Sequence, residues 1–109
     1  MLKSMEKAIG LAYDLGIKGD YEGLYSWLDD HEAKECGDNV AFLKYDTQDN
    51  LVEQLKQDLS TYVKLAKSDR IYLIWKEDDK LKGHYLFGKR KAAPWTGYGS
   101  RTVEIDEES

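Results

Sequence analysis

Residues 29–36, with the sequence DDHEAKEC, gather side chains that can bind a metal ion or transfer a proton. On a helix, His31 and Glu35 would lie one turn apart, and so would Glu32 and Cys36. Such pairs of imidazole, carboxylate and thiolate groups are ligands for divalent transition metals. However, Glu35 stands where the zinc-binding motif His-Glu-x-x-His has its second imidazole, and no distant third ligand is indicated. We therefore interpret the segment as the solvated end of a helix and expect no metal and no cofactor.

Nucleophilic catalysis would require an activated side chain, and Cys36 beside His84 is the pairing that the sequence offers. No local signature places an orienting group next to either residue. The chain also lacks a glycine-rich loop of the phosphate-binding type, because the GYGS sequence at residues 97–100 is too short. We therefore expect no catalytic residues and a non-enzymatic protein.

A basic segment, residues 80–101, interrupts a chain whose net charge is −5. This segment holds six Lys or Arg residues, four aromatic residues and no Asp or Glu. Basic side chains neutralise phosphates and aromatic rings stack on unpaired bases, so the segment predicts binding to single-stranded RNA or DNA, or to another anion. The candidate residues for this role are Lys82, Lys89, Arg90, Lys91, Tyr98 and Arg101.

The basic segment has a second interpretation, as part of a β-hairpin. Strand alternation would direct Tyr85 and Phe87 into the core and Lys82 and His84 toward solvent. Lysines at the end of an edge strand would then discourage pairing with other chains. The acidic net charge of the whole chain favours this interpretation over nucleic-acid binding.

Trp27 and Trp95 are candidate anchors for a protein partner. Trp27 lies one position away from the apolar stripe of its predicted helix, so we expect it at the edge of the buried face. There it would lie beside Asp29, Asp30 and Glu32, which suits a basic partner. Trp95 follows the basic cluster in a glycine-containing loop. The alternative is that Trp27 completes the core while the acidic residues solvate the helix, and that Trp95 folds back onto the sheet.

Apolar periodicity predicts helices over residues 2–15, 20–36 and 48–67. Apolar residues of the first helix recur at spacings of three and four, and Gly16 follows the last of them. These residues are Leu2, Met5, Ile9, Ala12 and Leu15. Asp20 is a suitable N-cap for the second helix.

Short apolar runs predict strands at residues 39–45, 70–75 and 81–89. The last two are joined by the turn sequence KEDDK and should form an antiparallel hairpin. Residues 101–105 are the candidate for one further strand. The resulting order, α-α-β-α-β-β with this additional strand at its end, predicts an α+β fold in which helices cover one face of a small sheet.

The length of 109 residues predicts a single α+β domain over residues 1–105, followed by a frayed acidic tail at 106–109. No apolar run is long enough to cross a bilayer, and the first residues lack the pattern of a signal peptide. The lone Cys36 cannot form an internal disulfide, so we expect a cytoplasmic protein without membrane contact.

Together these features favour a small, non-enzymatic cytosolic binding protein of the adaptor, inhibitor or immunity type, acting on a protein partner that the sequence does not identify. The alternative is a protein that binds single-stranded RNA or DNA through residues 80–101. The sequence indicates no oligomeric state.

Overall fold

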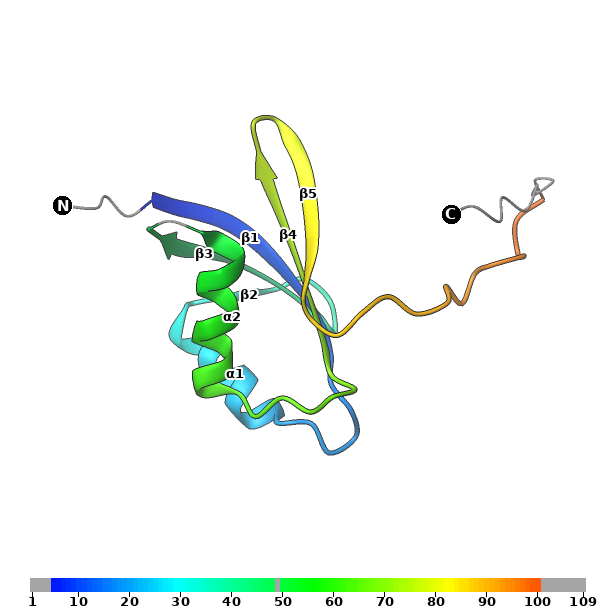
Figure 1. Ribbon diagram of the computed structural model, residues 1–109, viewed down its shortest axis with the longest axis horizontal. Coiled ribbons are helices and arrows are strands. Elements are labelled where there is room, and N and C mark those ends of the chain that lie inside the picture. The colour runs from blue at the N-terminus through cyan, green and yellow to red at the C-terminus, as the bar shows by residue number, and fades with distance from the viewer. Residues whose placement is uncertain (1–4, 49, 101–109) are drawn as a thin grey trace.

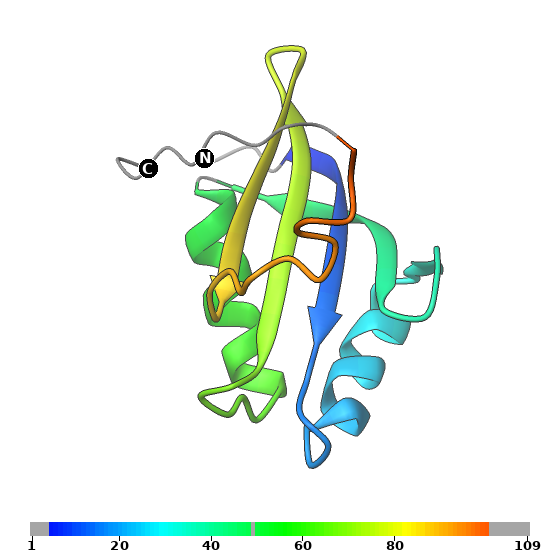
Figure 2. The same cartoon turned by 90° about the vertical axis from the view of Figure 1, so that its right-hand side faces the viewer.

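The chain folds into an antiparallel sheet with two helices packed on one of its faces, as Figures 1 and 2 show. The structure is a computed structural model, and it describes residues 5–48 and 50–100. Its elements in chain order are β1 (Met5–Asp14), α1 (Tyr21–Asp30), β2 (Lys34–Glu35), β3 (Val40–Thr47), α2 (Leu51–Tyr62), β4 (Arg70–Glu77) and β5 (Lys80–Phe87). Among the described residues, no helix has the length and apolarity needed to span a membrane.

The observed order, β-α-β-β-α-β-β, contradicts the predicted order α-α-β-α-β-β. The strands lie in the sheet as β2-β3-β1-β4-β5, and each neighbouring pair is antiparallel. β1 therefore occupies the centre, and the connection from β3 through α2 to β4 passes over it, which is the split β-α-β arrangement. β5 extends the sheet by one strand beyond β4.

The first element is a strand and not the helix predicted over residues 2–15. Its buried side chains, Ile9, Leu11 and Tyr13, alternate with less buried ones, as in a strand with one covered face. The helical spacing was misleading because the small residues between the buried ones fit a helical periodicity as well as a strand periodicity. Gly10 costs a helix about 1 kcal/mol relative to alanine, and backbone pairing with both β3 and β4 stabilises the strand instead.

α1 ends at Asp30, well before the predicted end at residue 36. Asp20 caps its N-terminus as predicted, and its carboxylate accepts hydrogen bonds of 2.9 Å from the N–H groups of Lys64 and Gly23. These two hydrogen bonds, from Lys64 and then Gly23, lower the pKa of Asp20 because they stabilise the charged carboxylate. The same contacts join the start of α1 to the end of α2.

The second half of the chain agrees more closely with the sequence. α2 lies within the predicted helix over residues 48–67, and its N-cap Asn50 accepts a hydrogen bond of 3.1 Å from the Glu53 N–H. The predicted hairpin is confirmed by the antiparallel register of β4 and β5. The strand predicted at 101–105 and the tail at 106–109 lie outside the described residues.

The core lies between the helices and the face of the sheet that they cover. Its most deeply buried apolar side chains, each less than 2% exposed, are Ile9, Leu11, Leu24, Leu43, Leu55, Leu59, Ile71 and Leu73. Asp69 is equally buried, and its carboxylate accepts hydrogen bonds from the N–H groups of Gly16 at 2.9 Å and Ala66 at 2.7 Å. Both oxygens of this buried side chain thereby have hydrogen-bond partners, and the loops after β1 and α2 are held together.

Candidate functional site

The face of the sheet opposite the helices has no helix or strand over it in the described part of the chain (Figure 2). Cross-strand register places Phe42 and Ile74 on either side of Gly10, at the centre of this face. Phe42 keeps 38% of its surface exposed and Ile74 keeps 36%. We define the open face by eight residues: Ala8, Gly10, Ala12, Val40, Phe42, Tyr72, Ile74 and Tyr85.

The open face differs from the usual solvated side of an antiparallel sheet, which is polar. Its apolar centre is bordered by charged residues of the same strands. At one end, Arg70 donates a hydrogen bond of 2.8 Å to the Asp14 carboxylate. At the other end lie Lys44 and Lys76, both exposed. An apolar centre within a charged border is the usual composition of a protein-binding surface.

Tyr85 lies on the open face, whereas the sequence predicts that it fills the core. A bulge in the β4–β5 pairing, between Ile71 and Tyr72, shifts the alternation, and Leu86 takes the buried position. Tyr85 pairs instead with Tyr72, and their ring centroids lie 4.7 Å apart in an edge-to-face arrangement. The Arg90 guanidinium lies 5.8 Å from the centre of the Tyr85 ring.

The other three residues of this prediction have the expected exposure, although Lys82 and His84 lie on the unexpected face of the sheet. Lys82 and His84 are in register with Trp75 and Leu73, on the helix side of the sheet. Both remain exposed because the hairpin projects beyond the helices at this end (Figure 1). Phe87 packs, partly buried, against the core.

The basic segment does not form a single surface. Lys82 lies near the tip of the hairpin, where its ammonium group is 3.8 Å from the Glu77 carboxylate. Lys89 and Lys91 are exposed beyond the opposite end of β5, roughly 20 Å away along the strand. Arg90 lies with them, and Arg101 is outside the described residues. The structure thus separates Lys82 from Lys89, Arg90 and Lys91.

Residues 88–100 leave the sheet at the end of β5 and run away from it (Figure 1). Trp95 is 73% exposed and Tyr98 is 87% exposed. Trp95 therefore does not fold back onto the sheet, and its indole is free for contact with another molecule.

Trp27 is not a half-exposed anchor, because it is only 2% exposed within the core. Its ring stacks on His31, with centroids 4.0 Å apart. Asp29, Asp30 and Glu32 are exposed at the end of α1, on the helix side of the sheet. The end of α1, which carries the acidic candidates, and residues 88–100, which include Trp95, lie on opposite sides of the sheet (Figure 1).

The segment at residues 29–36 does not form the helical ligand pairs considered from sequence. α1 ends at Asp30, so neither His31 and Glu35 nor Glu32 and Cys36 are one helical turn apart. Within the described ranges, no group of three His, Cys, Asp or Glu side chains has a metal-binding arrangement.

Cys36 and His84 are also far from each other. Cys36 is exposed in the turn between β2 and β3, and His84 lies on β5, at the opposite edge of the sheet. The structure therefore does not assemble the nucleophile and base pairing that the sequence offered.

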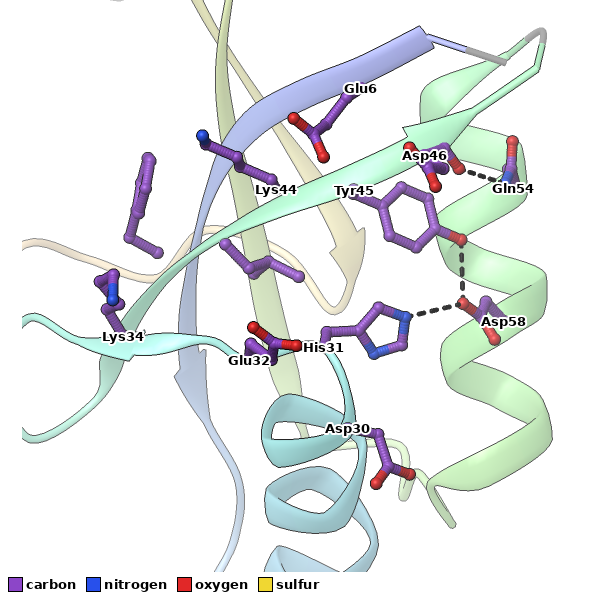
Figure 3. A pocket seen from close by; sticks show the side chains of 12 residues that line it. Glu6, Asp30, His31, Glu32, Lys34, Lys44, Tyr45, Asp46, Gln54 and Asp58 are labelled. Carbon is purple, nitrogen blue, oxygen red and sulfur yellow. Dashed lines mark hydrogen bonds and ion pairs between the residues drawn. The ribbon is translucent and has the colours of Figure 1, made fainter. Parts of the chain in front are cut away.

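A polar hollow of about 580 Å³ lies beside the end of α1, between α2 and β3 (Figure 3). The Tyr45 hydroxyl donates a hydrogen bond of 2.9 Å to the Asp58 carboxylate. His31 Nδ1 donates to the Trp27 carbonyl at 2.7 Å, which leaves Nε2 facing Asp58 at 3.9 Å. The lining residues are Glu6, Asp30, His31, Glu32, Lys34, Phe42, Leu43, Lys44, Tyr45, Asp46, Gln54 and Asp58.

The lining of this hollow is predominantly acidic. Burial and the neighbouring Asp58 raise the pKa of Tyr45, so its phenol stays protonated and does not act as a nucleophile. Five of the lining residues are carboxylates and two are lysines. This excess of negative charge favours ligands that carry amines or guanidinium groups.

A scan against protein families, a search of curated proteins and a search of solved structures found no match. The function is therefore inferred from the surfaces of the chain. Sequence reasoning missed Phe42, Tyr72 and Ile74 as contact residues. Their signal is the consecutive apolar residues at 40–43 and 71–75, a pattern of strands that carry apolar groups on both faces.

Proposed function

We propose that this chain is a small, non-catalytic binding protein that contacts a protein partner through the open face of its sheet. The observation that supports this most strongly is the exposure of Phe42 and Ile74, beside the half-buried Tyr72, on a face without a covering helix or strand. Aromatic and apolar groups at the centre of an interface provide most of its binding energy. Each square ångström of apolar surface buried there contributes about 25 cal/mol.

The partner should carry a complementary apolar patch with acidic residues beside it. Lys89, Arg90 and Lys91 begin at the end of β5, next to the open face, and they lack carboxylate neighbours in the same segment. Arg90 already lies over the Tyr85 ring, so the cationic border and the aromatic surface are continuous. Opposite charges at such a border increase the association rate and select the partner.

This activity suits an adaptor, an inhibitor or an immunity-type protein, since each acts by occupying a surface of another protein. We place the protein in the cytoplasm. The exposed, unpaired thiol of Cys36 supports this location, because reducing compartments keep such thiols free.

The test is affinity capture from the source cell with two matched variants. Ile74→Lys places a charge at the centre of the open face, and Tyr62→Lys places the same charge at a 63% exposed aromatic residue of α2. We expect Ile74→Lys to reduce capture of a specific protein by tenfold or more, which corresponds to about 1.4 kcal/mol. Tyr62→Lys should capture it normally. Equal recovery with both variants would contradict the proposal.

Single-stranded RNA or DNA is the second candidate ligand, and the contact between Arg90 and Tyr85 favours it. Tyr72 and Tyr85 offer aromatic surfaces for bases, with basic residues nearby for phosphates. In this case the chain should bind a labelled oligo(dT), with affinity that falls steeply as salt increases. Replacement of Lys89, Arg90 and Lys91 by alanine should weaken that binding. Unchanged binding by the triple variant would exclude this candidate.

A further inference from the structure

The edge strand β3 is only partly paired on its outer side. β2 pairs with Ala41 and Phe42 alone, although β3 continues to Thr47. The chain between α1 and β2 forms no strand, and it includes Glu32, whose φ of 54° is left-handed. Beyond Phe42, β3 is therefore an edge without a neighbouring strand in the described residues.

Hydrogen bonds at both ends show which backbone groups face this edge. The Val40 carbonyl accepts from the Cys36 N–H at 3.0 Å, and the Asp46 carbonyl accepts from Gln54 Nε2 at 2.9 Å. Backbone groups of alternate residues point to the same side of a strand. The N–H and C=O of Lys44, midway between these positions, therefore point outward as well.

Gln54 closes one end of the free edge. Its side-chain oxygen accepts hydrogen bonds from the Thr47 hydroxyl at 3.0 Å and from the Gln48 N–H at 3.1 Å. Together with the bond to Asp46, this side chain imitates the pairing of a short strand. β2 closes the other end, so the free edge is a gap of defined length centred on Lys44.

The polar hollow described above lies along this gap, as Figure 3 shows. On its helix side it contains His31 and Asp58, with Asp30 and Glu32 at the end of α1. The Asp58 side chain is 26% exposed, so its charge is partly shielded from solvent. On the opposite side of β3 the hollow is bordered by Lys44.

We propose that the free edge of β3 binds an extended, basic peptide segment of a partner protein by strand addition. The peptide backbone would pair with the N–H and C=O of Lys44, in line with β2. Alternate side chains of an added strand point to opposite faces. Lys or Arg residues would therefore point toward Asp58 and Glu32, and uncharged residues would lie on the side of Lys44. This surface adjoins the open face along β3, where Phe42 and Lys44 border both, but its peptide contacts are made by the outer edge of β3 and not by the centre of the open face.

The test uses the synthetic peptide KTKTKTKT, labelled for fluorescence anisotropy, with wild-type protein. Asp58→Asn keeps an acceptor for the Tyr45 hydroxyl but removes the charge, so we expect peptide binding to weaken about fivefold. The control Asp29→Asn removes an exposed carboxylate outside the hollow and should leave binding unchanged. Equal loss with both variants would show general charge attraction and would overturn the proposal.

Backbone pairing is tested separately by N-methylation of the peptide. Only alternate N–H groups of an added strand face β3, so methylation of one alternate set should abolish binding and methylation of the other should not. Binding that is insensitive to both sets, or lost equally with both, would overturn strand addition. If the protein forms a dimer that the peptide does not dissociate, the edge of β3 binds a second copy of this chain. This result would also overturn the proposal. Ile74→Lys should bind the peptide normally, which separates this result from that of the open face.

Discussion

Leu73 and Ile74 are neighbours on β4, yet Leu73 is fully buried beneath the helices and Ile74 keeps 36% of its surface exposed. The same contrast occurs on β1, where Leu11 is fully buried and Ala12, next to it, lies on the open face. One face of the sheet thus supplies the core. The other face presents apolar residues that the core does not use, and this difference separates folding from the proposed binding function.

The largest expected effect is on stability, and it comes from the covered face. Leu73→Ala should lower the free energy of unfolding by about 3 kcal/mol, because it leaves a cavity in a tightly packed core. Ile74→Ala should cost about 1 kcal/mol or less, since its side chain is already partly in water. Urea denaturation of the two variants measures both values. Similar losses would mean that the open face is part of the core, and the distinction between the faces would fail.

A smaller effect should come from the packing of Tyr72 across β5. A Cβ atom at Gly83 would overlap the Tyr72 hydroxyl, so Gly83→Ala should displace this ring and cost about 1 kcal/mol of stability. The double variant Gly83→Ala with Tyr72→Ala should be no less stable than Tyr72→Ala alone, because the overlap is then absent. Additive losses in this cycle would place Tyr72 away from Gly83 and would remove it from the open face.

The smallest expected effect concerns Asp20, which belongs to the covered side of the molecule. Its folded-state pKa is lowered from the ordinary value of 3.8, so its contribution to stability is present above that pH and is lost as the pH falls further. Asp20→Asn should therefore differ most from wild type near neutral pH and converge with it in acid. Thermal unfolding across this pH range checks the sign. A difference that grows in acid would contradict it.

The sequence predicted those elements whose local signals agree with each other. The β4–β5 hairpin combines alternation with a turn rich in Asp, and α2 combines a helical stripe with a suitable cap. The prediction of a helix in place of β1 was wrong because Ala8, Gly10 and Ala12 are compatible with both helical and strand periodicities. Pairing with β3 and β4, which is not local, decides in favour of the strand.

The candidate site was less predictable than the fold. Whether Phe42 or Ile74 is buried depends on which face the helices cover, and no residue pattern within one strand specifies that. The bulge that moves Tyr85 to the open face depends on the pairing of β5 with β4. The sequence predicts Trp27 at the edge of the buried face of its helix. The packing of α1 against the sheet instead buries Trp27, which excludes its contact with a partner.

Site-specific photo-crosslinking in the source cell tests the open face most directly. Ile74 on the open face and Tyr62 on α2 would each be replaced by p-benzoylphenylalanine, which reacts only with groups in direct contact. We predict a discrete crosslinked protein from position 74 and none from position 62. A crosslink from position 62 alone, or the absence of any protein crosslink from position 74, would contradict the assignment of the open face as the binding surface.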